Sequence, residues 1–199
     1  LAYILSRDGD LLTKTDSSWL KYSIPNKDIG AIRVTNDDDI SIPYDENMVL
    51  SPDDVIEYEV DFRSNGPPGG CLVSIHYYRD SVGGTHRGLD IYSGSGSSSL
   101  AAHLIHNWES SGGDQAIRIN TDVGGNGFVD VWDNQWHNIK VVYDGSRLES
   151  GLSMYVDGVK QPLQTAPDNP RAGNQSLLNA GVLSAKGAPV RVGGRTNVD

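Results

Sequence analysis

Three carboxylic acids alternate with other residues in one short segment of the chain, as Glu57, Glu59 and Asp61. Alternate residues of an extended strand project from the same side, with Cα atoms about 6.5–7 Å apart. Retaining glycoside hydrolases use two carboxyl groups about 5–5.5 Å apart, one as the nucleophile and one as the acid/base. The spacing therefore allows glycosidase chemistry at these acids. The other interpretation, which we favour, is a solvent-facing acidic edge strand, where charge discourages pairing with another chain.

A second group of acids lies in a turn-like run, Asn36-Asp37-Asp38-Asp39. Calcium binds carboxylate and carbonyl oxygens. Asp37, Asp38 and Asp39 are therefore the candidate metal ligands, and Ca²⁺ is the candidate cofactor. No spacing in the chain matches an EF-hand loop, and the acids of a solvated turn are the competing interpretation.

The histidines and the single cysteine do not form a catalytic motif. His103 and His106 fall in one predicted strand, where we expect them on opposite faces and unable to bind one ion together. No G-x-S-x-G motif accompanies them. Cys71 alternates with Val73 and Ile75, which predicts a buried, unreactive thiol. One cysteine also excludes a disulfide within this chain.

Aromatic residues near strand ends are the candidate ligand contacts, because flat rings stack on the C–H faces of sugars. Trp108 ends a predicted strand, Tyr78 lies near the end of another, and Trp132 lies in a turn. Packing inside the protein is the other interpretation for all three. Trp136 begins a predicted core strand, and we expect it to be buried.

The elements that must position these residues are β-strands. The segment 55–62 places Ile56, Tyr58, Val60 and Phe62 on one face and its three acids on the other, which is the pattern of a half-buried strand. The 23 glycines suit many tight turns, and no long stretch has helical periodicity. The 199 residues fit a single all-β domain.

The net charge argues against a nucleic-acid partner, and the hydropathy argues against a membrane-spanning helix. The net charge is −10, whereas nucleic-acid backbones attract clusters of lysine and arginine. We therefore expect no nucleic-acid partner. No run approaches the roughly 18 apolar residues that a membrane-spanning helix needs, so we expect no membrane span.

Two consecutive segments carry a resemblance to a known family. Residues 135–146 read QWHNIKVVYDGS and residues 151–159 read GLSMYVDGV. They resemble the laminin G-like branch of the concanavalin A-like lectin/glucanase superfamily. Other blocks similar to the family follow the same order, at 87–92, 103–108, 116–119 and 189–195. The resemblance implies a jelly roll, a sandwich of two antiparallel sheets, over residues 31–199.

Two features differ from the family pattern. Such modules continue after the Gly-Gly-Arg block at 193–195 into a final strand, whereas this sequence stops at Asp199. We interpret residues 1–30 as lead-in strands or the end of an upstream region. Either these residues or a neighbouring subunit would then complete the sheet. The family usually has neutral residues on the polar face of the strand at 55–62, whereas this chain has three acids there. Jelly-roll glucanases of the same superfold use a strand motif that resembles E-x-D-x-[x]-E, whereas this chain has the order Glu-x-Glu-x-Asp at 57–61.

The resemblance implies a non-catalytic recognition module that binds a glycan or another cell-surface ligand, secreted or exposed at a surface. The alternative is a structural or adhesive domain of a virion or an extracellular appendage. The hypothesis that we favour least is an enzyme. It would be a jelly-roll glycoside hydrolase that acts through Glu57 with Glu59 or Asp61.

Overall fold

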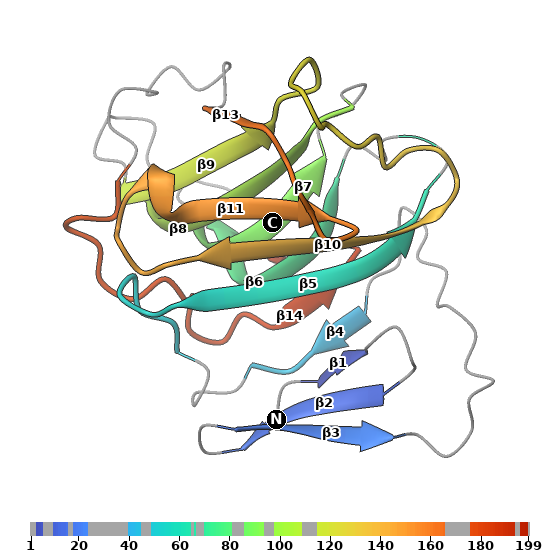
Figure 1. Ribbon diagram of the computed structural model, residues 1–199. Coiled ribbons are helices and arrows are strands. Elements are labelled where there is room, and N and C mark those ends of the chain that lie inside the picture. Colours follow the sequence, from blue (N-terminus) through green and yellow to red (C-terminus); the bar gives the residue numbers. More distant parts are fainter. Residues whose placement is uncertain are drawn as a thin grey trace.

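The computed structural model is a β-sandwich, as the sequence predicted (Figure 1). The structure describes residues 3–5, 10–15, 18–23, 40–44, 49–64, 66, 70–80, 86–93, 98–108, 115–165, 176–193 and 196–198. In these ranges the only helix is the short 3-10 helix η2, Glu149–Gly151. No helix in the described part of the chain is long and apolar enough to cross a membrane.

The larger sheet has eight strands in the described residues, in the order β13-β9-β8-β7-β6-β14-β4, with β15 also paired to β6. All these pairs are antiparallel except β15 with β6. The strands are β4 (Ile40–Ile42), β6 (Cys71–Asp80), β7 (His86–Ser93), β8 (Leu100–Trp108), β9 (Gln115–Thr121), β13 (Leu163–Thr165), β14 (Val190–Val192) and β15 (Thr196–Val198).

The smaller sheet has four antiparallel strands in the order β12-β11-β10-β5 and lies in front of the larger sheet in Figure 1. Its strands are β5 (Ile56–Arg63), β10 (Trp136–Tyr143), β11 (Leu152–Val156) and β12 (Val159–Lys160). A third sheet of three strands, β1 (Tyr3–Leu5), β2 (Asp10–Thr15) and β3 (Ser18–Ser23), falls in the segment predicted to hold lead-in strands.

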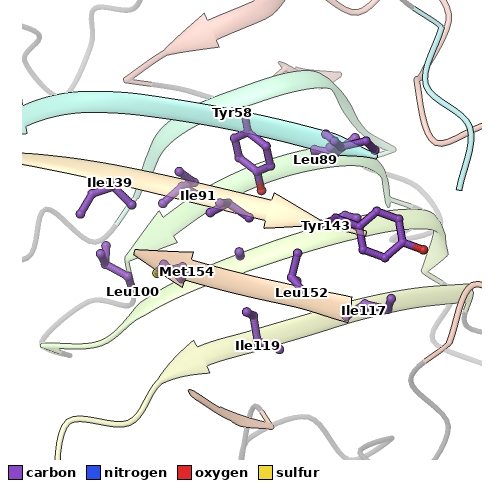
Figure 2. Close-up of a cluster of buried hydrophobic side chains, with 14 of the residues drawn as sticks. Tyr58, Leu89, Ile91, Leu100, Ile117, Ile119, Ile139, Tyr143, Leu152 and Met154 are labelled. Atoms are coloured by element: carbon purple, nitrogen blue, oxygen red, sulfur yellow. The ribbon is translucent and has the colours of Figure 1, made fainter. Parts of the chain in front are cut away.

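The core fills the space between the two sheets. Strand β5 turns Ile56 and Tyr58 inward, with 5% and 4% of their surfaces exposed, as its alternation predicted. The hydroxyl of Tyr58 donates to the backbone oxygen of Asp90 on β7, 3.3 Å away, and so connects the two sheets. Figure 2 shows the surrounding aliphatic side chains from both sheets. Cys71 is buried, as predicted.

Arg147 connects three loops at one end of the sandwich through hydrogen bonds. Its guanidinium donates two hydrogen bonds to the carboxylate of Asp53, at 2.6 and 2.7 Å. The same group donates to the backbone oxygens of Leu177, Leu178 and Ala180. Three loops that are far apart in the sequence therefore converge on one planar donor, which a lysine could not replace.

The hydroxyl of Tyr143 completes this connection from inside the protein. It donates to the backbone oxygen of Pro52 at 2.9 Å and accepts the backbone N–H of Arg147 at 2.6 Å. The side chain is fully buried, so water cannot replace either bond without a rearrangement. Gly145 lies beside it with φ of +77°, where a Cβ atom would be 2.6 Å from the backbone oxygen of Asp53.

We predict that Tyr143→Phe lowers the free energy of unfolding by about 2 kcal/mol, because the substitution leaves a buried donor and a buried acceptor without their partner. Urea denaturation measures the change. The matched control is Tyr155→Phe on the adjacent strand β11, where the ring faces outward, and we expect it to be nearly neutral. Equal losses for the two variants would contradict the role assigned to Tyr143.

Candidate functional site

The side chains of the smaller sheet that point away from the core form an open polar surface, which we call the outer face. Alternation along β5, β10 and β11 determines its members, because each strand turns every second residue toward the core. They are Glu57, Glu59, Asp61, Arg63, Trp136, Asn138, Lys140, Val142, Ser153 and Tyr155.

A depression with a volume of about 400 Å³ lies on this face. It is lined by Glu57, Asn138, Lys140, Val142, Tyr155 and Gly158. Register brings these residues together: Lys140 of β10 lies opposite Glu59 of β5 and opposite Tyr155 of β11. The depression therefore offers a carboxylate, an amide, an ammonium group and an aromatic ring within one short stretch of sheet.

Two of the three acids predicted as catalytic candidates have a partner on the neighbouring strand. Glu57 forms an ion pair with Lys140, with 2.6 Å between Oε1 and Nζ. The hydrogen bond that Lys140 donates to this carboxylate raises the pKa of Lys140. Asp61 accepts a hydrogen bond from the side-chain amide of Asn138 at 2.9 Å. Glu59 is exposed and lies opposite Lys140 in the register.

Trp136 belongs to the outer face, and the expectation that it is buried was wrong. Its surface is 49% exposed, and it lies opposite Arg63 in the pairing of β10 with β5. The reason is the phase of β10: His137, Ile139 and Val141 point inward, so the first residue of the strand must point outward. An exposed indole at the end of a polar face offers a ring on which a ligand can stack.

Trp132, one of the predicted ligand contacts, lies in the core. Only 8% of its surface is exposed. Its ring meets Phe62 edge to face, with 5.5 Å between centroids, and its indole N–H donates to the backbone oxygen of Ser98 at 2.9 Å. Both the ring and its donor are therefore occupied in packing.

Trp108 and Tyr78, the other predicted contacts, lie on strands separated by β7. Their backbones fall at neighbouring positions of the larger sheet, because Trp108 pairs with His86 and Tyr78 with Arg87. Their side chains lie outside the described residues, and their ligand role stays a prediction.

The candidate calcium ligands Asp37, Asp38 and Asp39 also lie outside the described residues. Within the described ranges, no group of three or more histidine, cysteine, aspartate or glutamate side chains is arranged to hold a metal ion. Calcium binding at residues 37–39 therefore stays a prediction.

A polar row that sequence reasoning missed crosses the larger sheet. Ser74, Asp90, His103 and Arg118 occupy one rung of four neighbouring strands. His103 Nδ1 lies 2.7 Å from Asp90 Oδ1, and their side chains are 10% and 0% exposed. The ring of Tyr92 stacks on His103 with 6.1 Å between centroids. Because both side chains are buried, the pair is not accessible to a large ligand. The outer face of the smaller sheet is open to one.

Comparisons with known proteins give one distant structural similarity. No family model matches the chain, and no curated protein matches it. Among solved structures, the chain is similar to the mouse laminin α1 chain, domains LG4-5, with a TM-score of 0.46 and 14% sequence identity. The match covers 81% of this chain, which spans 33% of the laminin chain. Membership of the laminin G-like family stays a prediction.

We predict that truncating two tryptophans four residues apart lowers stability by very different amounts. Trp132→Ala should lower the free energy of unfolding by about 3–5 kcal/mol, because it leaves a cavity beside Phe62. Trp136→Ala should cost less than about 1 kcal/mol, because the ring lies on the surface. Urea denaturation of both variants measures the difference. A large loss for Trp136→Ala would show that the indole packs in the protein and is not available to a ligand.

Proposed function

We propose that this domain is a non-catalytic recognition module that binds a glycan, or another surface ligand with similar polar groups, through the outer face of the smaller sheet. The observation that carries the proposal is the exposed ring of Trp136 on the same open face as Tyr155 and the polar side chains of the depression. Sugars present both C–H faces and hydroxyl groups, and this surface offers partners for both.

The length of the face favours an extended ligand. Trp136 and Lys140 are four residues apart on β10, and Tyr155 lies opposite Lys140. At about 3.4 Å per residue and about 4.8 Å between strands, the Cα atoms of Trp136 and Tyr155 are roughly 14 Å apart. A chain of several sugar units could contact both rings, whereas a single sugar would reach only one.

The charges on the face favour binding over catalysis. Glu57 is paired with Lys140, and Asp61 accepts a hydrogen bond from Asn138. Glycosidases that retain configuration need one carboxylate free to attack and one carboxylic acid to donate a proton. These features support a binding surface, and we place no catalytic residue on it.

The second candidate is a structural or adhesive domain within a larger assembly, such as a virion or an extracellular appendage. Strand β5 supports it, because among the described residues β5 pairs with β10 on one side and with no strand on the other. A neighbouring subunit could pair with this edge. In either case we propose a location outside the cell or at a surface, where such a ligand or subunit is met.

We predict that the purified domain binds glycans on an array, screened with and without calcium. Trp136→Ala and Tyr155→Ala should each weaken binding by about tenfold or more, because each removes a stacking surface. Lys186→Ala is the control, since Lys186 is exposed and lies outside the outer face. A blank array from folded protein would favour the structural candidate, and binding that survives both aromatic substitutions would place the site elsewhere, with Trp108 and Tyr78 tested next.

We also predict that any polysaccharide bound in that screen stays uncleaved. Incubation with the domain, followed by an assay for reducing ends, should give the same value as buffer alone. The variants Glu57→Gln and Glu59→Gln serve as controls for a trace activity. Hydrolysis by the unmodified domain that disappears in either variant would overturn the non-catalytic assignment.

A further inference from the structure

His137 lies between two carboxylates that come from different segments of the chain. Its Nδ1 is 2.7 Å from Asp157 Oδ2, and its Nε2 is 3.0 Å from Asp133 Oδ1. The side chain of His137 is 8% exposed, whereas those of Asp133 and Asp157 are 48% and 45% exposed. Both ring nitrogens therefore face an oxygen that can only accept a hydrogen bond when ionised.

Only the protonated ring satisfies this geometry. The imidazolium ion has two N–H donors, whereas the neutral ring has one donor and one lone pair. When the ring loses its proton, one carboxylate faces a lone pair and that contact becomes repulsive. Burial of the ring opposes its charge, but the hydrogen bonds and charges of Asp133 and Asp157 outweigh burial and raise the pKa of His137.

The two carboxylates also hold the backbone on either side of the ring. Asp133 Oδ1 accepts the backbone N–H of Gln135 at 2.8 Å. Asp157 Oδ1 accepts the backbone N–H of Asn138 at 2.9 Å. The backbones of Asn134 and Asp157 have φ of +65° and +50°. Residues other than glycine rarely adopt this left-handed conformation. We call residues 133–138 together with Asp157 the His137 corner.

The His137 corner carries one end of the outer face. Trp136 and Asn138 flank His137 in the chain and belong to that face. Asn134 accepts a hydrogen bond from the guanidinium of Arg63 at 3.2 Å, and its backbone N–H donates to the oxygen of Ser64. A change in the contacts of His137 therefore acts directly on the backbone that presents the exposed indole.

Other elements around the ring present apolar groups. On β5 the residue opposite His137 is Phe62, and its charged neighbours Asp61 and Arg63 point to the outer face. On β11 the strand ends at Val156, which is buried. Among the described residues, Asp133 and Asp157 are thus the charged groups in contact with the ring.

We propose that protonation of His137 positions Trp136 and Asn138, so that the outer face is ordered for its ligand at mildly acidic pH and loosened at alkaline pH. The part that concerns ligand binding rests on the function proposed above, whereas the ordering of the corner does not. His137 is a positioning residue here, because it acts on the face through its neighbours.

The raised pKa of His137 determines how its contribution to stability changes with pH. The folded-state pKa of His137 is raised above the ordinary histidine value of 6.5. Its contribution to stability is therefore fully present below about pH 6.5 and is lost as the pH rises through the folded-state pKa. Asp133 behaves oppositely: the hydrogen bond that it accepts from His137 lowers its pKa below 3.8, so its contribution is lost only as the pH falls through that lower value.

The first arm of the test needs no ligand. Nuclear magnetic resonance follows the ring signals of His137, the indole N–H of Trp136 and the amide of Asn138 from pH 5 to pH 9. We expect all three to shift together with one midpoint above about 6.5. Asp133→Asn should move that midpoint to lower pH while the fold is retained, and His137→Gln should abolish the common shift at Trp136 and Asn138.

The matched control is His106→Gln, because Nδ1 of His106 lies 2.7 Å from the backbone oxygen of Val182 and so meets a carbonyl group. This variant should keep the shift of the unmodified domain. If His137 titrates while Trp136 and Asn138 stay unchanged, or if their shift persists in His137→Gln, the inference is overturned.

The second arm measures the affinity for a glycan found on the array at pH 6 and at pH 9. We expect binding about tenfold weaker at the higher pH, with this difference lost in His137→Gln. A common shift of the corner without any glycan ligand would contradict the proposed function and leave the positioning role supported. Binding that requires Trp136 but is equal at both pH values would retain the proposed function and overturn its regulation by His137.

Discussion

The pairing of β10 with β5 is the constraint on which the rest of the structure depends. It sets Ile139 opposite Val60 and Tyr143 opposite Ile56, so that both strands turn their apolar residues into the same core. Because side chains alternate with a period of two, a slip of one residue would exchange the buried and exposed sets on β10. The same register therefore fixes both the core and the composition of the outer face.

Local alternation made much of this predictable. The segment 55–62 has an apolar residue at every second position, and the structure places a strand at Ile56–Arg63 with that face inward. Trp136 is the residue of β10 whose exposure differed from its prediction. Its place at the start of a predicted core strand suggested burial, yet the alternating Ile139, Val141 and Tyr143 already fix the phase of Trp136 outward. The sequence held that information, and alternation alone was enough to find it.

The contacts of the candidate site could not be found this way, because they join residues that are distant in the chain. Asn138 and Asp61 are 77 positions apart, and only the register of β10 and β5 makes them neighbours. The pair of His103 and Asp90 depends in the same way on the pairing of β8 with β7. Turns and alternation predict strands one at a time, whereas register depends on the fit of whole sheets.

The two histidine–aspartate sites, at His103 and at His137, differ in how deeply their carboxylates are buried. The carboxylate of Asp90 is fully buried beside His103, so water does not reach that carboxylate. The carboxylates beside His137 are nearly half exposed and keep water when the ring becomes neutral. Loss of its proton therefore weakens one corner without threatening the core. Of the two sites, only the one at His137 combines a buried ring with hydrated partners, and it lies beside the face that a ligand would contact.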